Sequence, residues 1–181
     1  MISIQPASPR DIPSLVSLVN SAYRGDSSRK GWTTEADLLD GQRTDRESLT
    51  RVLADPDSLL LTCLMDEGTL VGCVHLQRQG EDLYLGMLTV SPDKQGAGIG
   101  KSLLTAAEVH AKASHCRALT MTVISVRHEL IAWYQRHGYT WTGETKPFPT
   151  DVKFGQPKEP LEFVVLKKSM TGMQAGDQVP G

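Results

Sequence analysis

Apolar residues recur along the chain at two spacings, which predict alternating helices and strands. From residue 12 to residue 23 they lie three and four positions apart, as on one face of an amphipathic helix. Ser8 and Pro9 suit the cap and first position of that helix, and Asp11 lies near its positive end. Further helices are expected over residues 33 or 34 to 39, 46–54, 99 to about 113, and 127–137.

Runs rich in apolar and β-branched residues predict the strands. They occupy residues 2–6, 58–66, 69–79, 82–90, 118–125, 139–144 and 161–168. Glu67 and Gly68 predict a hairpin turn between two of these runs. Residues 145–160 carry four prolines without periodicity, which is typical of a long loop. The element order β-α-α-β-β-β-α-β-α-β-β predicts an α+β fold, with a mixed sheet and helices on both faces.

The size and charge of the chain exclude several classes of protein. Its 181 residues suit one domain, which we expect at 2–168, followed by a flexible tail at 169–181. A net charge of −2 argues against broad binding to nucleic acid or to an anionic membrane. No apolar run approaches the roughly 20 residues that span a bilayer, and the N-terminus does not resemble a secretory signal. We therefore expect a cytoplasmic protein.

Cysteine and histidine spacings predict neither a disulfide framework nor a metal site. Cys63, Cys73 and Cys116 are widely spaced, each in or beside an apolar segment, which favours buried, reduced thiols. The histidines show no metal-ligand spacing, and packing or surface roles are expected for most of them. His75 alternates within a predicted strand and is open to either face.

The segment "SPDKQGAGIGKSLL", residues 91–104, superficially resembles the phosphate-binding loop of nucleotide triphosphatases. That loop requires a glycine where this chain has Gln95, and no nearby strand ends in an aspartate for magnesium. The alternating glycines also differ from the dinucleotide-binding pattern. Glycines directly before a helix can instead leave backbone N–H groups free to hold a diphosphate. From spacing alone, a tight strand-to-helix turn remains an equal alternative.

Two blocks of sequence resemble the GNAT acetyltransferase superfamily. They are "MLTVSPDKQGAGIGKSLL", residues 87–104, and "LIAWYQRHGYTWTGE", residues 130–144. The matching positions are Gln95, Gly98 and Gly100 in the first block and Tyr134, Gly138 and Tyr139 in the second. The similarity in element order extends over roughly 2–168. It implies a central, twisted, mostly antiparallel sheet that splays into a V.

The resemblance also implies that acetyl-CoA is the acetyl donor and a primary amine of a small molecule or peptide is the acceptor. Tyr134 would protonate the leaving thiolate after direct attack by the amine. The residues implied in binding the donor are Leu88, Val90, Gln95, Gly96, Ala97, Gly98, Ile99, Gly100 and Lys101. Arg127 stands where the family often has an asparagine, and it is the tenth candidate for binding the donor.

No motif identifies the acceptor site. Glu35 is the candidate general base, and Trp32, Arg43 and Tyr84 are candidates for contacting the acceptor. Packing roles for the aromatic residues and solvated charges are the alternatives. Phe148 and Phe154, in the proline-rich loop, are candidates for a lid. A GNAT-like module that binds CoA without catalysis is the alternative function, and both a monomer and a homodimer fit the sequence.

Overall fold

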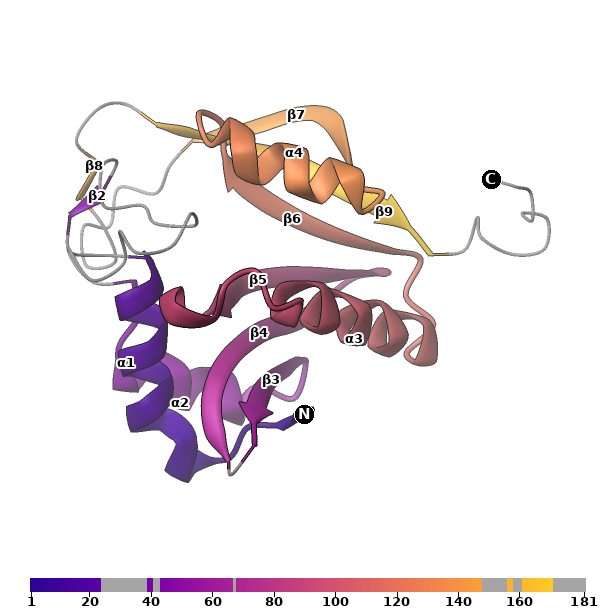
Figure 1. Cartoon of the computed structure of the whole chain (residues 1–181). Coiled ribbons are helices and arrows are strands. Elements are labelled where there is room, and N and C mark those ends of the chain that lie inside the picture. Colours follow the sequence, from indigo (N-terminus) through magenta and orange to yellow (C-terminus); the bar gives the residue numbers. More distant parts are fainter. Residues whose placement is uncertain (24–38, 41–42, 67, 148–155, 158–160, 171–181) are drawn as a thin grey trace.

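The computed structural model describes residues 1–23, 39–40, 43–66, 68–147, 156–157 and 161–170 (Figure 1). Its main sheet has seven strands in the order β1-β3-β4-β5-β6-β9-β7. The strands are β1 (Ile2–Pro6), β3 (Ser58–Met65), β4 (Thr69–Gln79), β5 (Asp82–Val90), β6 (Ala118–Ile124), β7 (Thr140–Pro147) and β9 (Glu162–Ser169). A smaller sheet pairs β2 (Leu39–Asp40) with β8 (Gln156–Pro157). The helices are α1 (Ile12–Tyr23), α2 (Arg46–Ala54), α3 (Ile99–Ala113) and α4 (His128–Arg136).

Helix α1 begins with a capped turn, as its sequence predicts. A short 3-10 turn, Pro9–Asp11, precedes the α-helix, and the Asp11 carboxylate accepts a hydrogen bond from the Ser8 backbone N–H at 2.8 Å. This reciprocal cap satisfies a donor that the first turn would otherwise leave unpaired. The residues that α1 buries are Ile12, Leu15, Leu18, Val19, Ala22 and Tyr23.

Two predicted elements differ from the structure by more than one residue at an end. The helix expected to end at Leu39 is wrong there, because Leu39 pairs with Pro157 in a short antiparallel bridge; the rest of that prediction lies outside the described residues. Strand β7 runs to Pro147, beyond the predicted end at residue 144. All of its residues are exposed, so hydrogen bonding to β9 rather than a buried apolar face holds this edge strand, and no hydrophobic pattern marks its end.

The C-terminal strand continues slightly past the expected domain boundary. Strand β9 includes Ser169, and Met170 is buried in the core with 5% of its surface exposed. The backbone N–H of Met170 donates to the Arg117 carbonyl at 2.7 Å, which fastens the end of β9 beside the start of β6. The remainder of the predicted tail lies outside the described residues.

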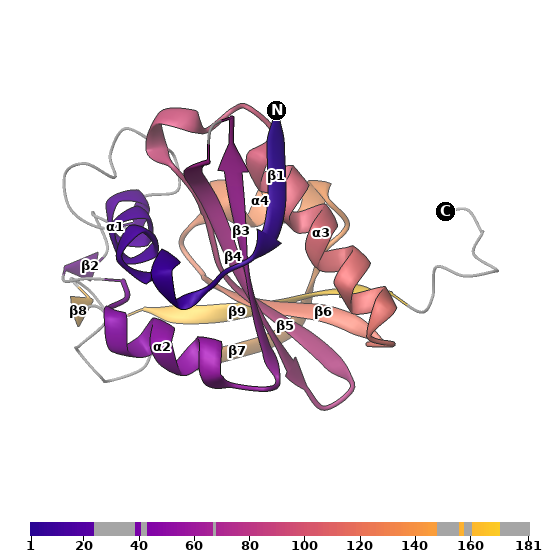
Figure 2. The same cartoon turned by 90° about the horizontal axis from the view of Figure 1, so that it is seen from below.

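Helices cover both faces of the main sheet (Figure 2). Side chains of β4 alternate between the faces, as expected for a strand. Cys73 packs with Leu60 and the buried residues of α1 and α2. Val74 and Leu76 pack with α3 on the opposite face. The mixed sheet with helices on both faces, predicted from the sequence, is therefore confirmed.

The sheet opens between β5 and β6. These two strands are parallel and pair only from Asp82 with Ala118 to Tyr84 with Thr120. Beyond Tyr84 they diverge, and the two halves of the sheet form a V (Figure 1). On its other edge β5 contains a bulge, where Met87 adopts a positive φ of 54° and the register with β4 shifts. The end of β5 thus turns away from the regular sheet at the mouth of the V.

Gly72 offers a test of how α3 packs on the sheet. A Cβ added there would lie 2.9 Å from the Thr89 carbonyl oxygen and 3.0 Å from Leu103 Cδ1. Gly72→Ala is expected to lower the free energy of unfolding by about 1–3 kcal/mol, through overpacking. Gly100→Ala is the control, because its nearest contacts would be an ordinary 3.6 Å. Chemical denaturation compares the two variants, and equal losses would contradict this account of α3 packing.

Candidate active site

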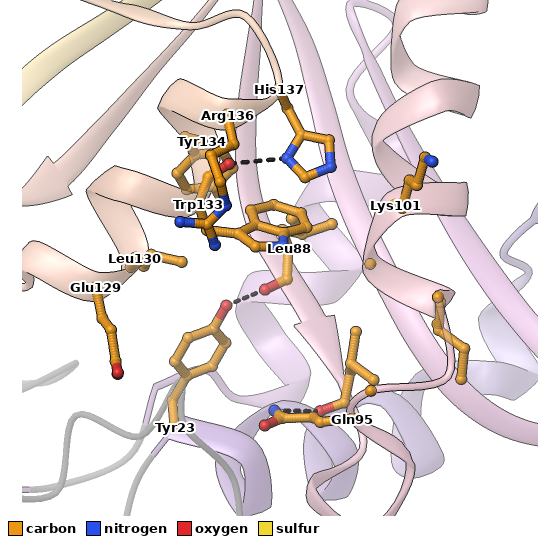
Figure 3. A pocket seen from close by; sticks show the side chains of 15 residues that line it. Tyr23, Leu88, Gln95, Lys101, Glu129, Leu130, Trp133, Tyr134, Arg136 and His137 are labelled. Atoms are coloured by element: carbon orange, nitrogen blue, oxygen red, sulfur yellow. Dashed lines mark hydrogen bonds between the residues drawn. The ribbon is translucent and has the colours of Figure 1, made fainter.

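A pocket of about 480 Å³ lies where the V opens, between the end of β5, the start of α3 and one face of α4 (Figure 3). Tyr23, from the end of α1, closes it from the opposite side. The lining residues are Tyr23, Leu88, Val90, Gln95, Gly96, Gly98, Ile99, Gly100, Lys101, Glu129, Leu130, Trp133, Tyr134, Arg136 and His137.

The glycine loop forms the wall of the pocket at the start of α3. Gly96 and Gly98 have positive φ angles of 95° and 82°, and a Cβ on either would meet no atom within 4 Å. Backbone conformation rather than crowding therefore favours glycine at both positions. Gly98 caps α3, and the N–H of Ser102 donates to its carbonyl at 3.0 Å. The helical N–H groups before Ser102 precede this first intrahelical bond, so they lack an acceptor within the helix.

One face of α4 forms the facing wall. Trp133 lies over the glycine loop, 3.6 Å from the position that a Cβ of Gly100 would take. Its ring also stacks at a tilt on His137, with centroids 4.3 Å apart. His137 Nδ1 lies 2.8 Å from the Trp133 carbonyl oxygen, and because a carbonyl only accepts, Nδ1 carries a proton. Figure 3 shows the Trp133 indole beside Leu88, at the centre of the pocket.

Tyr134 supplies a buried phenol. Its side chain is 5% exposed, and it contacts Trp133 and Tyr139 edge to face. Burial is the main cause that raises the pKa of Tyr134, and the nearby phenols of Tyr23 and Tyr84 raise it further, whereas Arg127 lowers it. The hydroxyl therefore remains protonated at neutral pH and is available as a hydrogen-bond and proton donor.

Tyr23 ties α1 to the bulged end of β5. Its hydroxyl donates a hydrogen bond to the Leu88 carbonyl, directly after the positive-φ residue Met87 (Figure 3). The Arg43 guanidinium lies over the Tyr23 ring, 5.6 Å from its centroid. Asn20 holds that segment in place, since its Oδ1 accepts from the Arg43 backbone N–H at 2.6 Å. The end of α1 thus joins the segment before α2 to the mouth of the V.

The structure brings most of the predicted donor-binding residues together. Those that line the pocket are Leu88, Val90, Gln95, Gly96, Gly98, Ile99, Gly100 and Lys101. Ala97 is outside the lining set. Arg127 is also outside it, and lies at the start of α4, where it acts electrostatically on Tyr134. The binding role of all ten residues stays a prediction.

The predicted acceptor residues are only partly described. Trp32 and Glu35 lie outside the described residues, as do Phe148 and Phe154. Arg43 lies beside Tyr23, as above. Tyr84 reaches across the V, with its hydroxyl 3.0 Å from Thr122 Oγ1 on β6.

Several lining residues were missed by the sequence reasoning. They are Tyr23, Glu129, Leu130, Trp133, Arg136 and His137. The α4 residues among them recur at helical spacing around Tyr134, so the face of that helix was a usable signal. No comparable signal existed for Tyr23, which is one apolar position of α1 among several.

The described residues contain no group of three or more His, Cys, Asp or Glu placed to hold a metal ion. Among the helices in that same part of the chain, none combines the length and the apolar character needed to cross a membrane.

Comparison with known proteins assigns the family. Residues 14–139 match the model of the acetyltransferase (GNAT) family, so the chain belongs to that family. An uncharacterized protein of Bacillus subtilis (strain 168), YdhI, is 26% identical over 95 residues, which span 52% of this chain and 56% of that relative. The chain thus matches little more than half of the relative's length.

Solved structures share the fold over nearly the whole chain. The ribosomal-protein-S18-alanine N-acetyltransferase from Escherichia coli has a TM-score of 0.72 at 14% identity, covering 100% of both chains. The PaiA N-acetyltransferase from Thermoplasma acidophilum, solved in complex with coenzyme A, has a TM-score of 0.65 at 20% identity, covering 93% of this chain and 99% of that one. The splayed, mostly antiparallel GNAT fold is therefore confirmed.

The hydrogen bond from Tyr23 to the bulge gives a prediction about stability. Tyr23→Phe removes the donor and leaves the Leu88 carbonyl without it, so we expect the free energy of unfolding to fall by about 1–3 kcal/mol. Tyr84→Phe is the control, because the Tyr84 hydroxyl bonds to the Thr122 hydroxyl rather than to a backbone carbonyl. Loss of this hydrogen bond is expected to cost less, since the Thr122 hydroxyl can rotate toward another partner. Urea titration measures both, and a Tyr23→Phe variant as stable as the parent would show that this bond is dispensable.

Proposed function

We propose that this protein is an N-acetyltransferase that moves the acetyl group of acetyl-CoA to a primary amine of a small molecule or peptide. One observation carries the proposal: a single pocket joins the glycine loop at the start of α3 to the buried phenol of Tyr134. Phosphate binding and proton donation are two of the functions that such a transfer asks of the protein. The coenzyme supplies an activated thioester.

The glycine loop fits the diphosphate of coenzyme A. Gly96 and Gly98 leave the space above their Cα atoms open, so a phosphate can approach the backbone closely. The N–H groups from Gln95 to Lys101 would hold it, and the positive end of the α3 dipole adds to the attraction. Lys101 contributes a positive charge at the same wall.

The unpaired edge of β5 fits the extended pantetheine arm. Pairing of β5 with β6 stops at Tyr84, so beyond that residue the described strands leave this edge of β5 open. Leu88 and Val90 line the pocket on this edge, and Trp133 faces them from α4. An extended amide chain can add to such an edge as a strand would. The thioester end would then point toward Tyr134 and Tyr23.

Tyr134 would donate its proton to the departing sulfur. The phenol is protonated at neutral pH, since even the ordinary pKa of tyrosine is near 10 and burial raises it further. A thiol has an ordinary pKa near 8.5, so the thiolate leaves with little assistance. Holding the two reactants side by side is expected to contribute more to the rate than the acid does. A module that binds CoA without catalysis remains the second candidate, and it predicts binding without thiol release.

We propose that the reaction takes place in the cytoplasm and that residues 2–168 form the functional domain, with the last strand continuing to Ser169. Cys63, Cys73 and Cys116 are all free and buried, which suits a reducing compartment. Arg43 and Tyr84 remain the described candidates on the acceptor side, with the acceptor's amine entering opposite the coenzyme. A net charge of −2 does not favour nucleic acid as acceptor. Both a monomer and a homodimer are compatible with this proposal.

Acetyl-CoA is expected to stabilise the protein. At 100 times its dissociation constant, a ligand of the native state adds about 2.7 kcal/mol to the free energy of unfolding, which scanning fluorimetry detects as a higher Tm. Gly98→Asp is expected to abolish this rise in Tm, because the added carboxylate repels the phosphates and its side chain keeps them away from the backbone N–H groups.

The matched control for that variant is Gly80→Asp. Gly80 also has a positive φ, 64°, with open space around its Cα, but it lies in the β4–β5 turn and is not among the pocket residues. Gly80→Asp places an aspartate at a similar positive φ, so it introduces a similar backbone strain. Acetyl-CoA should raise its Tm by as much as it raises that of the parent protein. Absence of a shift in the parent protein at millimolar acetyl-CoA would refute the proposed donor.

Tyr134→Phe is expected to lower kcat by about 100-fold and to leave the dissociation constant for acetyl-CoA nearly unchanged. Thiol release from acetyl-CoA with a panel of primary amines measures the first quantity, and calorimetry measures the second. Tyr139→Phe is the control, because it removes a neighbouring buried hydroxyl that bonds to Glu108 rather than facing the pocket. Equal turnover of Tyr134→Phe and the parent would assign the acid role to water.

A further inference from the structure

A chain of polar side chains crosses the α1/α2 face of the sheet and has no part in the pocket. The Asp55 carboxylate accepts a hydrogen bond from the Ser58 hydroxyl at 2.8 Å and from Gln77 Nε2 at 3.0 Å. The Ser58 oxygen in turn lies 2.9 Å from His75 Nε2. The hydrogen bonds thus run from the Asp55 carboxylate to the Ser58 hydroxyl and on to the His75 imidazole, with the serine between the other two.

This order fixes where the protons lie. Hydrogen bonds from the Asp57 backbone, Gln77 and Ser58 lower the pKa of Asp55, so its carboxylate is ionised and only accepts. Ser58 has one hydroxyl proton, and Asp55 receives it. The Ser58 oxygen can then only accept from His75, which places a proton on Nε2. In a neutral ring the lone pair is therefore on Nδ1.

His75 is held neutral near pH 7. Burial lowers its pKa below the usual 6.5; Asp55 opposes this change, and Arg43 reinforces it. The titratable neighbours on the same sheet face are Cys73 and Tyr84. Burial raises the pKa of Cys73 to about 12, so it remains an uncharged thiol. The Nδ1 lone pair of His75 is thus available near pH 7. Among the described residues, the one anion that acts on the pKa of His75 is Asp55, which lies on the Nε2 side of the ring, beyond Ser58.

Strand register places His75 beside the open half of β5. Its ladder partners are Leu60 on β3 and Gly86 on β5. Leu60 packs against α1 and α2, and directly opposed residues share a face, so His75 lies on the face opposite α3. Gly86 precedes Leu88 by two residues, with the bulged residue Met87 between them. The face that carries His75 is thus the one from which the acceptor would approach the thioester.

We propose that Nδ1 of His75 takes the proton of the acceptor's ammonium group, and that Ser58 and Asp55 are positioning residues that fix its tautomer. The inference rests on the proposed acetyltransferase function. It identifies the acceptor as a primary amine that arrives protonated and is deprotonated on the α1/α2 face, directly or through one water.

Protons and bonds balance in this scheme. His75 takes one proton from the ammonium, and the freed nitrogen lone pair forms the new C–N bond while the C–S bond breaks. Tyr134 gives its proton to the sulfur and regains one from the nitrogen, which becomes the amide. His75 then returns its proton to solvent. The sum is ammonium plus thioester giving amide, thiol and one proton.

A purely structural role for the chain makes different predictions. Asp55 ends α2, and the three side chains could serve only to fasten α2 to the sheet. Both roles predict some loss of stability when Ser58 is changed. The hydrogen bonds of Ser58 require the Nε2–H tautomer in either role. Only the catalytic role also requires a rate that depends on the protonation of His75, so the pH profile separates the two.

The first experiment uses the free protein and needs no acceptor. NMR of ¹⁵N-labelled histidine at pH 7.5, with His75→Gln to assign the signals, is expected to show His75 neutral with its proton on Nε2. Ser58→Ala should remove this tautomer preference, and Ser58→Thr, which keeps the hydroxyl, should preserve it. A proton on Nδ1, or a charged ring at this pH, would overturn the proposal.

The second experiment measures kcat against pH with acetyl-CoA and a panel of primary amines that includes butylamine, lysine and a dipeptide. A base must be unprotonated, so the parent's kcat should fall as pH drops through the pKa of His75, below 6.5. His75→Gln keeps an N–H toward Ser58 but cannot take a proton. We expect it to lose this limb and about 100-fold in kcat, with acetyl-CoA affinity unchanged.

The outcomes also separate this inference from the function on which it rests. An unaltered pH limb in His75→Gln, with normal acetyl-CoA binding, would overturn only the role of His75. A parent protein that is not stabilised by acetyl-CoA, whatever its tautomer, would overturn the proposed function and this role with it. Ser58→Thr activity close to the parent's, with Ser58→Ala impaired, would support positioning by the hydroxyl.

Discussion

The short parallel pairing of β5 with β6 is the constraint on which the rest of this structure depends. The two strands share hydrogen bonds only from Asp82 to Tyr84. A strand in the middle of a sheet normally has all its backbone groups paired, because unpaired polar groups are costly to bury. Here, among the strands that the structure describes, none pairs with the second half of β5 on this edge. The protein thus acquires a polar, extended surface at the bottom of a pocket, framed by α3 and α4.

The bulge keeps this opened strand in a defined position. Met87 has a positive φ, which is unfavourable for a side chain with a Cβ, so surrounding contacts have to maintain it. Its carbonyl accepts from Thr89 Oγ1 at 2.9 Å, and the next carbonyl, that of Leu88, accepts from Tyr23. Side chains from β5 itself and from α1 therefore satisfy groups that a neighbouring strand would satisfy in a regular sheet. Rigidity at this point matters for any reaction that requires two bound molecules to be aligned.

The two faces of the opened sheet carry different chemistry. On the α3/α4 face, open glycines precede a helix N-terminus, and a buried phenol retains its proton. On the α1/α2 face, a half-buried imidazole remains neutral because desolvation opposes its charge. Burial thus acts in opposite senses on the two groups: it raises the pKa of Tyr134 and lowers that of His75. Each is left in its uncharged form, one a proton donor and the other a proton acceptor.

The sequence by itself determined the order of the main-sheet strands and of helices α1 to α4, the glycine loop and the block around Tyr134, because these depend on local periodicity and on residues whose backbone preferences are strong. It did not predict the small sheet of β2 and β8. It failed where local pattern carries little information. Strand β7 is exposed throughout, so hydrogen bonds to β9 rather than hydrophobicity define its length. Only the tertiary structure decided that Tyr23 meets Leu88 and that His75 meets Ser58, since these contacts join residues distant in sequence through strand register and helix placement.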